Sequence, residues 1–125
     1  MAMKGLNSLE QAVIDKLLSG DHPVLAALRI QAEKAHLVGR EYTGVGFFCD
    51  FDVPSDAPTL KGDFHIGDVT GKLQGLANGA GFVLFIRDGR LDALEGFTYD
   101  EPWPKEIGTF TLTYMAEPRD LSGFV

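Results

Sequence analysis

The sequence predicts an α+β fold in which two N-terminal helices pack on a mainly antiparallel sheet of about five strands. Two observations lead to this prediction. Apolar residues recur at helical spacing before about residue 40, whereas later segments alternate with a period of two or form short apolar runs. Helices followed by strands that are joined through short turns favour an antiparallel meander backed by helices. From the chain length, we expect residues 1–125 to form a single globular domain.

The first predicted helix begins after Asn7, because this side chain can cap it and Glu10 can reach back to the cap backbone. Apolar residues then recur at four-residue spacing from Leu9 to Leu17, which is typical of a helix with one buried face. Gly20 is the expected end of this helix, since glycine readily adopts the left-handed conformation found there.

A second helix is predicted to start at Asp21-His22-Pro23, because proline in the first turn of a helix loses no hydrogen bond. Its expected end is Gly39. Apolar residues lie on two sides of this helix, with Leu28 on one side and Ile30 on the other. We therefore expect both sides to be covered, by the sheet and by either the first helix or a dimer partner.

The longest predicted strand spans residues 42–53, where apolar residues alternate with a period of two. Cys49 falls on the core face of this strand. We interpret Cys49 as a small buried apolar side chain and not as a nucleophile, because no basic neighbour in the sequence would lower its pKa. Further strands are expected over residues 64–76, with an interruption near Gly67, and over residues 109–115.

The clearest local signal is a hairpin at Asp88-Gly89, which separates two apolar runs. This pair favours a type I′ turn, in which both central residues need positive φ. The resulting register places Leu84 opposite Ala93. The apolar period of the second strand slips soon afterwards, so we expect a β-bulge near Gly96.

The first strand of this hairpin, residues 82–86 (FVLFI), is apolar on both faces. Such a run favours a central strand with both sides covered. We expect loops or another subunit to cover the second face. If that face were an interface between copies, the chain would be a homodimer.

Composition limits the partners that we expect. The chain carries 18 acidic and 11 basic residues, for a net charge of −7. An acidic protein repels phosphate, so no nucleic-acid partner is predicted, whereas a basic protein partner is favoured by charge steering. The longest apolar run is too short to cross a membrane, and no secretory signal opens the chain. With its single cysteine, which fits a reducing compartment, the chain is predicted to be cytoplasmic.

No motif in the sequence predicts catalysis, metal binding or a cofactor. The three histidines lack the spacing of metal ligands, and no P-loop, zincin or nucleophile elbow occurs. An enzymatic alternative would use paired carboxylates, either Glu95 with Glu101 or Asp92 with Glu95, held in different environments. Acidic residues on a strand of an acidic protein are more often a solvated face. We therefore predict no catalytic residue, no metal and no cofactor.

Aromatic and acidic residues are concentrated after the hairpin, and they are the candidate contacts to a partner. Tyrosine and tryptophan combine a large apolar area with one polar group, which favours interfaces. Pro102 and Pro104 keep the backbone around Trp103 extended. Alternatively, Trp103 closes one end of the core. The predicted partner-binding residues are Glu95, Tyr99, Asp100, Glu101 and Trp103.

Two strings, residues 40–48 (REYTGVGFF) with residues 51–54, and residues 81–104 (GFVLFIRDGRLDALEGFTYDEPWP), resemble a family of small uncharacterised bacterial cytosolic proteins. The resemblance covers much of the chain from the second helix to Pro104. It implies no activity, because none is assigned to that family. The Trp103-Pro104 pair after an acidic, aromatic strand is also similar to some small immunity proteins of bacterial toxin systems.

Three hypotheses about function follow. The first is a non-enzymatic protein-interaction module, with immunity-like binding of a basic toxin or enzyme as one form of it. The second is a small-molecule binder or an enzyme that uses Glu95 or Glu101, with a pocket lined by Phe48, Tyr99 and Trp103. The third is a homodimer whose apolar second face is its interface.

Overall fold

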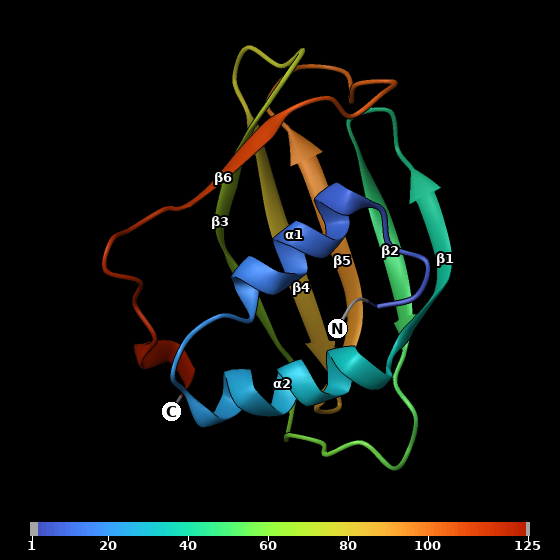
Figure 1. Cartoon of the computed structure of the whole chain (residues 1–125), viewed down its shortest axis with the longest axis vertical. Coiled ribbons are helices and arrows are strands. Elements are labelled where there is room, and N and C mark those ends of the chain that lie inside the picture. The colour runs from blue at the N-terminus through green and yellow to red at the C-terminus, as the bar shows by residue number, and fades with distance from the viewer. Residues whose placement is uncertain (1–2, 125) are drawn as a thin grey trace.

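A computed structural model describes residues 3–124 of the chain (Figure 1). Its helices are α1 (Ser8–Leu17) and α2 (Pro23–Lys34), and a short 3-10 helix, η1 (Ser122–Phe124), follows the last strand. Its strands are β1 (His36–Tyr42), β2 (Gly46–Asp52), β3 (Phe64–Leu73), β4 (Ala80–Arg87), β5 (Arg90–Thr98) and β6 (Phe110–Tyr114). The predicted α+β class with an antiparallel sheet is confirmed, but the sheet has six strands instead of about five.

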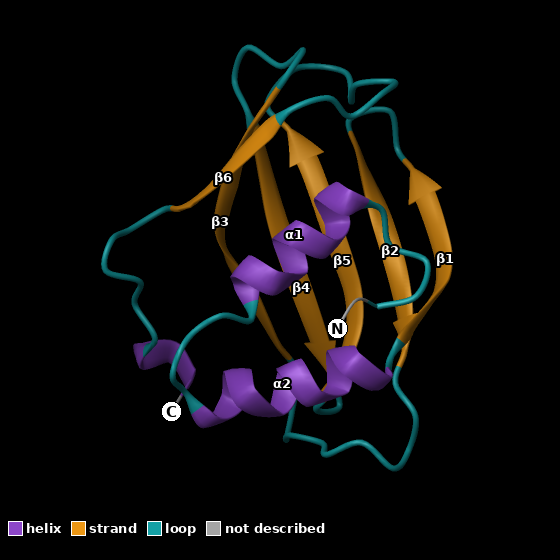
Figure 2. Cartoon of the chain, in the orientation of Figure 1, coloured by secondary structure: helices purple, strands orange, loops and turns teal. Residues whose placement is uncertain are grey.

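All six strands belong to one antiparallel sheet with the order β1-β2-β5-β4-β3-β6. Both helices lie on the same face of this sheet (Figure 1 and Figure 2). α1 contacts β3, β4 and β6, and α2 contacts β5. The opposite face carries neither helix, and we call it the helix-free face. Within the single chain the sheet covers one side of α2 and the first helix does not cover the other, because Ile30 is 43% exposed, so cover by a dimer partner stays a prediction.

The sequence signals at the helix starts are confirmed. Asn7 Oδ1 accepts a hydrogen bond from the Glu10 N–H at 2.8 Å, and the Glu10 carboxylate accepts one from the Asn7 N–H at 3.0 Å. α2 begins at Pro23, as predicted. α1 ends at Leu17 and not at Gly20, and Arg29 and Arg119 donate hydrogen bonds to carbonyl groups of residues 17–19 at this end. Within residues 3–124, neither helix is long and apolar enough to cross a bilayer.

A strand that was not predicted follows the second helix. α2 ends at Lys34 and not at Gly39, and the next residues form β1, which pairs antiparallel with β2. Pairing with a strand further along the chain cannot be recognised from helical spacing alone, and here it overrides the local pattern. The strand predicted over residues 42–53 is accordingly shorter. It begins at Gly46, after a tight turn in which Gly44 has a φ of +89°.

The predicted hairpin turn between β4 and β5 is confirmed, with positive φ at Asp88 (50°) and Gly89 (75°). The Gly89 backbone also binds the loop that precedes β3. Its N–H donates to the Gly62 carbonyl at 2.9 Å, and its carbonyl accepts from the Leu60 N–H at 3.0 Å. A Cβ atom on Gly89 would lie 1.9 Å from the Leu60 carbonyl oxygen, so this position requires glycine.

The bulge in this hairpin lies at Asp92 and not near Gly96. Leu84 faces Leu94, where the prediction had Ala93, because Asp92 has no partner across the ladder. The extra residue directs Leu94 into the core, where it is fully buried. The slip in the apolar period between Ala93 and Leu94 therefore does reflect a bulge, which lies just before it at Asp92.

Glu10 is almost fully buried and connects α1 to β1. The guanidinium of Arg40 donates to both oxygens of the Glu10 carboxylate, with 2.9 Å from Nε to Oε2, and to the Gly5 carbonyl at 2.9 Å. The hydrogen bond to Glu10 raises the pKa of Arg40. Cys49 lies beside this pair and is fully buried, which raises the pKa of its thiol to about 12. The interpretation of Cys49 as a buried core residue is confirmed.

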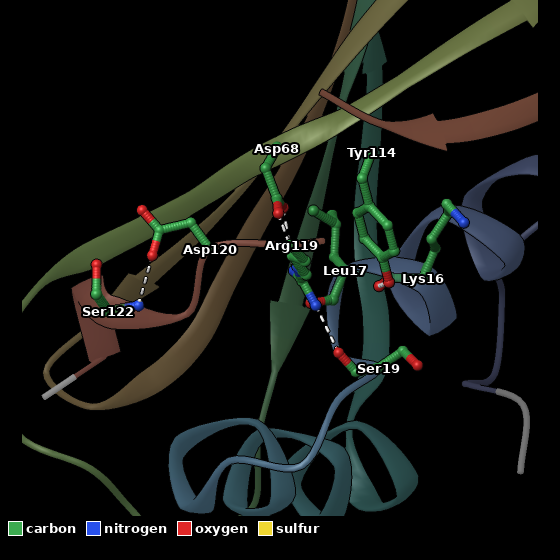
Figure 3. A network of polar contacts seen from close by, with 8 residues as sticks. All are labelled: Lys16, Leu17, Ser19, Asp68, Tyr114, Arg119, Asp120 and Ser122. Carbon is green, nitrogen blue, oxygen red and sulfur yellow. Dashed lines mark hydrogen bonds and ion pairs between the residues drawn. The ribbon is translucent and has the colours of Figure 1, made fainter. Parts of the chain in front are cut away.

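The segment after β6 is held by Arg119 (Figure 3). This guanidinium donates to both carboxylate oxygens of Asp68, at 2.7 and 3.0 Å, and to the carbonyl groups of Leu17 and Ser19 at the end of α1. It also lies 4.7 Å from the centroid of the Tyr114 ring. One side chain therefore joins the C-terminal segment, the first helix and β3.

Gln31 is the buried polar residue that attaches α2 to the sheet. Its Nε2 donates to the carbonyl groups of Pro58 and Gly89, both at 2.8 Å, and its Oε1 accepts from the Leu91 N–H at 2.9 Å. The side chain is fully buried. All of its bonds are therefore made away from water, where an unmade hydrogen bond is costly.

We expect Gln31→Ala to lower the free energy of unfolding by ~2–4 kcal/mol, because each buried group left unsatisfied costs ~1–3 kcal/mol. Urea unfolding followed by tryptophan fluorescence measures this change. The matched control is Glu33→Ala on the exposed side of the same helix, which should change stability by less than ~0.5 kcal/mol. Equal stability of the two variants would show that Gln31 does not attach α2 in this way.

Candidate functional site

The helix-free face carries a patch of apolar side chains around one carboxylate. In β4 the buried residues Phe82 and Leu84 belong to the core between helices and sheet, so the alternating Val83 and Phe85 lie on the other face. The same alternation applies to β2 and β5. The patch, which we call the helix-free patch, consists of Phe48, Val83, Phe85, Ala93, Glu95 and Phe97.

The apolar members of this patch are not part of the hydrophobic core. Phe48, Val83, Phe85 and Phe97 are each partly exposed, and none of them packs against the core cluster. The ladders place Phe48 and Val83 on either side of Glu95, and Phe85 opposite Ala93. The side chains therefore shield one another on the face that the helices leave uncovered. The prediction of a strand that is apolar on both faces is confirmed, but the helices cover only one of them.

Glu95 lies at the centre of this patch. Its flanking residues in the sheet are Phe48 and Val83, and Phe97 follows it on the same face of β5. Burial raises the pKa of Glu95, because the apolar surroundings disfavour the charged form. Among residues 3–124, no side chain or backbone group forms an ion pair or hydrogen bond with this carboxylate. Glu95 is therefore a carboxylate in a partly apolar environment whose charge no described residue compensates.

Two aromatic side chains extend the patch toward the end of β5. The rings of Phe97 and Tyr99 meet edge to face, with 5.6 Å between their centroids. They lie over Gly81, where a Cβ atom would be 2.6 Å from Phe97 Cζ and 2.8 Å from the Tyr99 hydroxyl oxygen. Glycine at this position lets both rings approach the backbone of β4. Tyr99 remains 43% exposed.

The five predicted partner-binding residues do not lie together. Glu95 and Tyr99 are on the helix-free face, and Asp100 is exposed in the turn that follows β5, with a φ of +61°. Glu101 points to the β3–β4 loop, where its carboxylate accepts hydrogen bonds from two backbone N–H groups at 2.8 Å each. The Glu101 carboxylate thus closes a loop of its own chain.

Trp103 lies on the side of the sheet that faces the helices. Its ring meets that of Phe47, a core residue, with 5.2 Å between the centroids, and the backbone N–H of Trp103 donates to the Gly44 carbonyl at 2.8 Å. These contacts agree with the alternative prediction, in which Trp103 closes one end of the core. Since Phe48 lies on the opposite face, the predicted pocket between Phe48, Tyr99 and Trp103 is not formed.

The carboxylates of the two predicted pairs, Glu95 with Glu101 and Asp92 with Glu95, do not bind to one another, because Asp92 and Glu101 each have other partners. Asp92 lies 3.8 Å from the Arg87 guanidinium, and Glu101 binds backbone N–H groups, so neither contacts Glu95. Within residues 3–124, no group of three or more histidine, cysteine or acidic side chains could hold a metal ion. Next to Tyr99 there is an open hollow of about 580 Å³, lined by side chains that include Thr70, Lys72 and Thr113.

Comparisons with protein-family models, curated proteins and solved structures give no match to this chain. The resemblance to small bacterial cytosolic proteins therefore stays a prediction. Function has to be inferred from the geometry of the chain itself. The sequence signal for the helix-free patch is the two-sided apolar run of residues 82–86, which predicts a covered second face and, as one alternative, a homodimer interface, but does not indicate Glu95 as its centre.

We expect Glu95→Gln to stabilise the protein at pH 7. Because its folded-state pKa is raised, Glu95 contributes most to stability below its unfolded pKa of ~4.3, and this contribution is lost as the pH rises through the folded-state pKa. The gain from the neutral glutamine should stay below ~1 kcal/mol at pH 7, since the side chain is partly solvated.

Urea unfolding of both proteins at pH 7 and near pH 4 measures this effect, and the difference should vanish at the lower pH. Glu33→Gln, on the exposed side of α2, is the matched control. A Glu95→Gln variant that is less stable than wild type at pH 7 would mean that the carboxylate makes favourable contacts in the free protein.

Proposed function

We propose that this chain is a non-enzymatic protein-interaction module that binds its partner through the helix-free patch. The observation that carries the proposal is Glu95, a partly buried carboxylate without an ion pair from residues 3–124. Exposed apolar patches on a folded chain are typical of interaction sites. A carboxylate inside such a patch lowers the stability of the free protein, and a partner that supplies the counter-charge would remove this disadvantage.

The chemistry of the patch favours a lysine or arginine that is flanked by apolar residues of the partner. Two further exposed carboxylates, Glu41 and Asp50, lie on the same face, opposite Phe48 and Ala93 in the ladders. The net charge of −7 would steer a basic protein toward this surface. Arginine in particular forms charge-assisted, two-point hydrogen bonds with a carboxylate.

The aromatic side chains around Glu95 would supply the apolar part of the contact. Phe48, Phe97 and Tyr99 lie on the same face, and the ring of Tyr99 also presents a hydroxyl group. Aromatic residues at the centre of an interface often contribute ~2 kcal/mol or more each to binding. Charge would then determine which partner binds, and apolar contact would supply most of the affinity.

An immunity protein that neutralises a basic toxin is one module with this chemistry, and we include it within the proposal. We also propose a cytoplasmic location, which the single buried free thiol of Cys49 supports. Association of two copies through the helix-free patch is less favourable. It would bring two Glu95 carboxylates into one apolar interface without a counter-charge.

A second candidate function is the binding of a small molecule in the hollow beside Tyr99. Lys72, Thr70, Thr113 and Tyr99 would offer one positive charge and three hydroxyl groups there. Two of these hydroxyl groups already lie 3.2 Å apart and share a hydrogen bond. The hollow does not include Glu95, so the two functions can be separated by mutation.

The decisive variant is Glu95→Arg, because it reverses the charge without changing the core. Wild type, Glu95→Arg and the matched control Glu33→Arg are immobilised and exposed to a lysate of the cells that encode the chain. A protein retained by wild type and by Glu33→Arg is then identified and purified. Its dissociation constant for Glu95→Arg should be at least ~30-fold weaker, since breaking a buried charge pair costs ~2 kcal/mol or more.

Capture alone does not support the proposal. A lysine or arginine of the purified partner, when changed to glutamate, must restore binding to Glu95→Arg. A partner that binds Glu95→Arg as well as wild type would contradict the proposal, as would a wild-type protein that retains only copies of itself or nothing at physiological salt. Loss of partner binding in Lys72→Glu but not in Glu95→Arg would place the protein contact at the hollow beside Tyr99 and contradict its assignment to the helix-free patch.

A further inference from the structure

The helix-free patch has the shape of a stripe along β4 and β5. Its apolar side chains come from the neighbouring strands β2, β5 and β4, which gives the stripe a width of about 10 Å. Along β5 it extends from Ala93 to the end of the strand at Thr98, a length of about 17 Å. Phe85 lies opposite Ala93 at one end, and the rings of Phe97 and Tyr99 meet at the other. A helix of about three turns, which is about 10 Å wide, has these dimensions.

Polar side chains border this stripe on both sides, and the two borders differ in charge. Toward β1 and β2 the border is acidic and is formed by the exposed Glu41 and Asp50. Toward β3 it is formed by Thr70 and by His65, whose ring centroid lies 6.3 Å from that of Phe85. A segment that covers the stripe therefore needs an apolar face with basic side chains along one side of it.

The backbone of β4 and β5 gives an incoming strand nothing to pair with. Both strands have a neighbour on each side, so their backbone N–H and C=O groups are used within the sheet. An extended partner segment over the stripe would leave its own N–H and C=O groups without partners on an apolar surface, which costs free energy. A helix satisfies its backbone groups internally and presents one apolar side. The stripe therefore favours a helix over a strand.

We infer that the partner binds the stripe with an amphipathic α-helix whose axis follows β4 and β5. This inference rests on the proposed function, and it specifies the kind of segment that the helix-free patch accepts. The apolar residues of the partner helix recur at i, i+3, i+4 and i+7 and lie on Phe48, Val83 and Phe97. The complex then has helices on both faces of the sheet, which is a stable arrangement of layers.

The carboxylates determine where the basic residues of this partner helix lie. Asp50 is opposite Ala93 in the ladder, so it is displaced from Glu95 by two residues, or about 6.6 Å, along the strand direction. Residues i and i+4 of a helix are displaced by about 6 Å along its axis. Two lysines or arginines one turn apart therefore match Glu95 and Asp50, and both lie on the side of the helix that faces β2.

Two synthetic peptides of about 14 residues with identical composition test the inference. One has leucines at i, i+3, i+4 and i+7 and two arginines one turn apart beside them, whereas the other alternates apolar and polar residues. Fluorescence anisotropy at ~150 mM salt measures their dissociation constants. The helical peptide should bind wild type at least ~10-fold more tightly than the alternating peptide. Glu95→Arg should weaken its binding at least ~10-fold, and the matched control Glu33→Arg on α2 should bind it like wild type.

Three results with these peptides would overturn the inference. The first is an alternating peptide that binds wild type as tightly as the helical one. The second is a helical peptide that binds Glu95→Arg as it binds wild type. The third is the absence of binding of either peptide with a dissociation constant below ~1 mM.

The spacing of crosslinks in the captured partner separates failure of this inference from failure of the proposed function. Phe97 lies four residues beyond Ala93, which is opposite Phe85, so positions 85 and 97 are about 13 Å apart along the stripe. A photo-crosslinking residue at each position in turn should link to partner residues about nine apart in a helix, but about four apart in an extended segment.

A spacing of about four, in a partner whose binding depends on Glu95, overturns the helix and leaves the helix-free patch as the binding surface. A captured partner whose binding does not depend on Glu95 contradicts the proposed function, and the inference with it.

Discussion

The structure depends on one constraint: a six-stranded sheet has two faces, and this chain places both of its helices on the same one. The central strands are nevertheless apolar on both faces. Leu84 is fully buried under the helices, whereas Val83, its neighbour, is only partly covered. The helices give the first face a complete core. The second face keeps apolar area and a carboxylate in contact with water, and this is why we place the interaction there.

Buried polar residues hold the helices in this arrangement, and each of them has hydrogen-bond partners within the chain. Gln31 uses both polar atoms of its amide on the loop and the hairpin, Glu10 is bound by Arg40, and Arg119 joins α1 to β3. Glu95 differs from all of them, because it is partly buried and has no such partner among the described residues. Gln31, Glu10 and Arg119 therefore stabilise the fold, whereas the Glu95 carboxylate is available to bind a partner.

Local sequence signals correctly predicted those structural features that depend only on neighbouring residues. The capping box of Asn7 and the turn at Asp88-Gly89 depend on neighbouring residues, and both were predicted correctly. β1 was missed because it exists only through pairing with β2. The prediction that the aromatic and acidic residues after the hairpin form one site failed for a related reason. Residues adjacent in sequence at the end of β5 diverge in space, so Trp103 joins the core while Tyr99 remains on the helix-free face.

A photo-crosslinking amino acid at position 83 tests the central claim most directly, with the same group at position 30 on the exposed side of α2 as the control. Both positions carry an apolar residue at the surface, but on opposite sides of the sheet. Crosslinking in the cells that encode the chain, followed by mass spectrometry of the linked peptide, identifies the contact. We predict that position 83 links to a segment of another protein with a lysine or arginine among apolar residues, and that position 30 does not. Crosslinks from position 30 alone, or an acidic segment linked to position 83, would contradict the assignment of the helix-free patch as the binding surface.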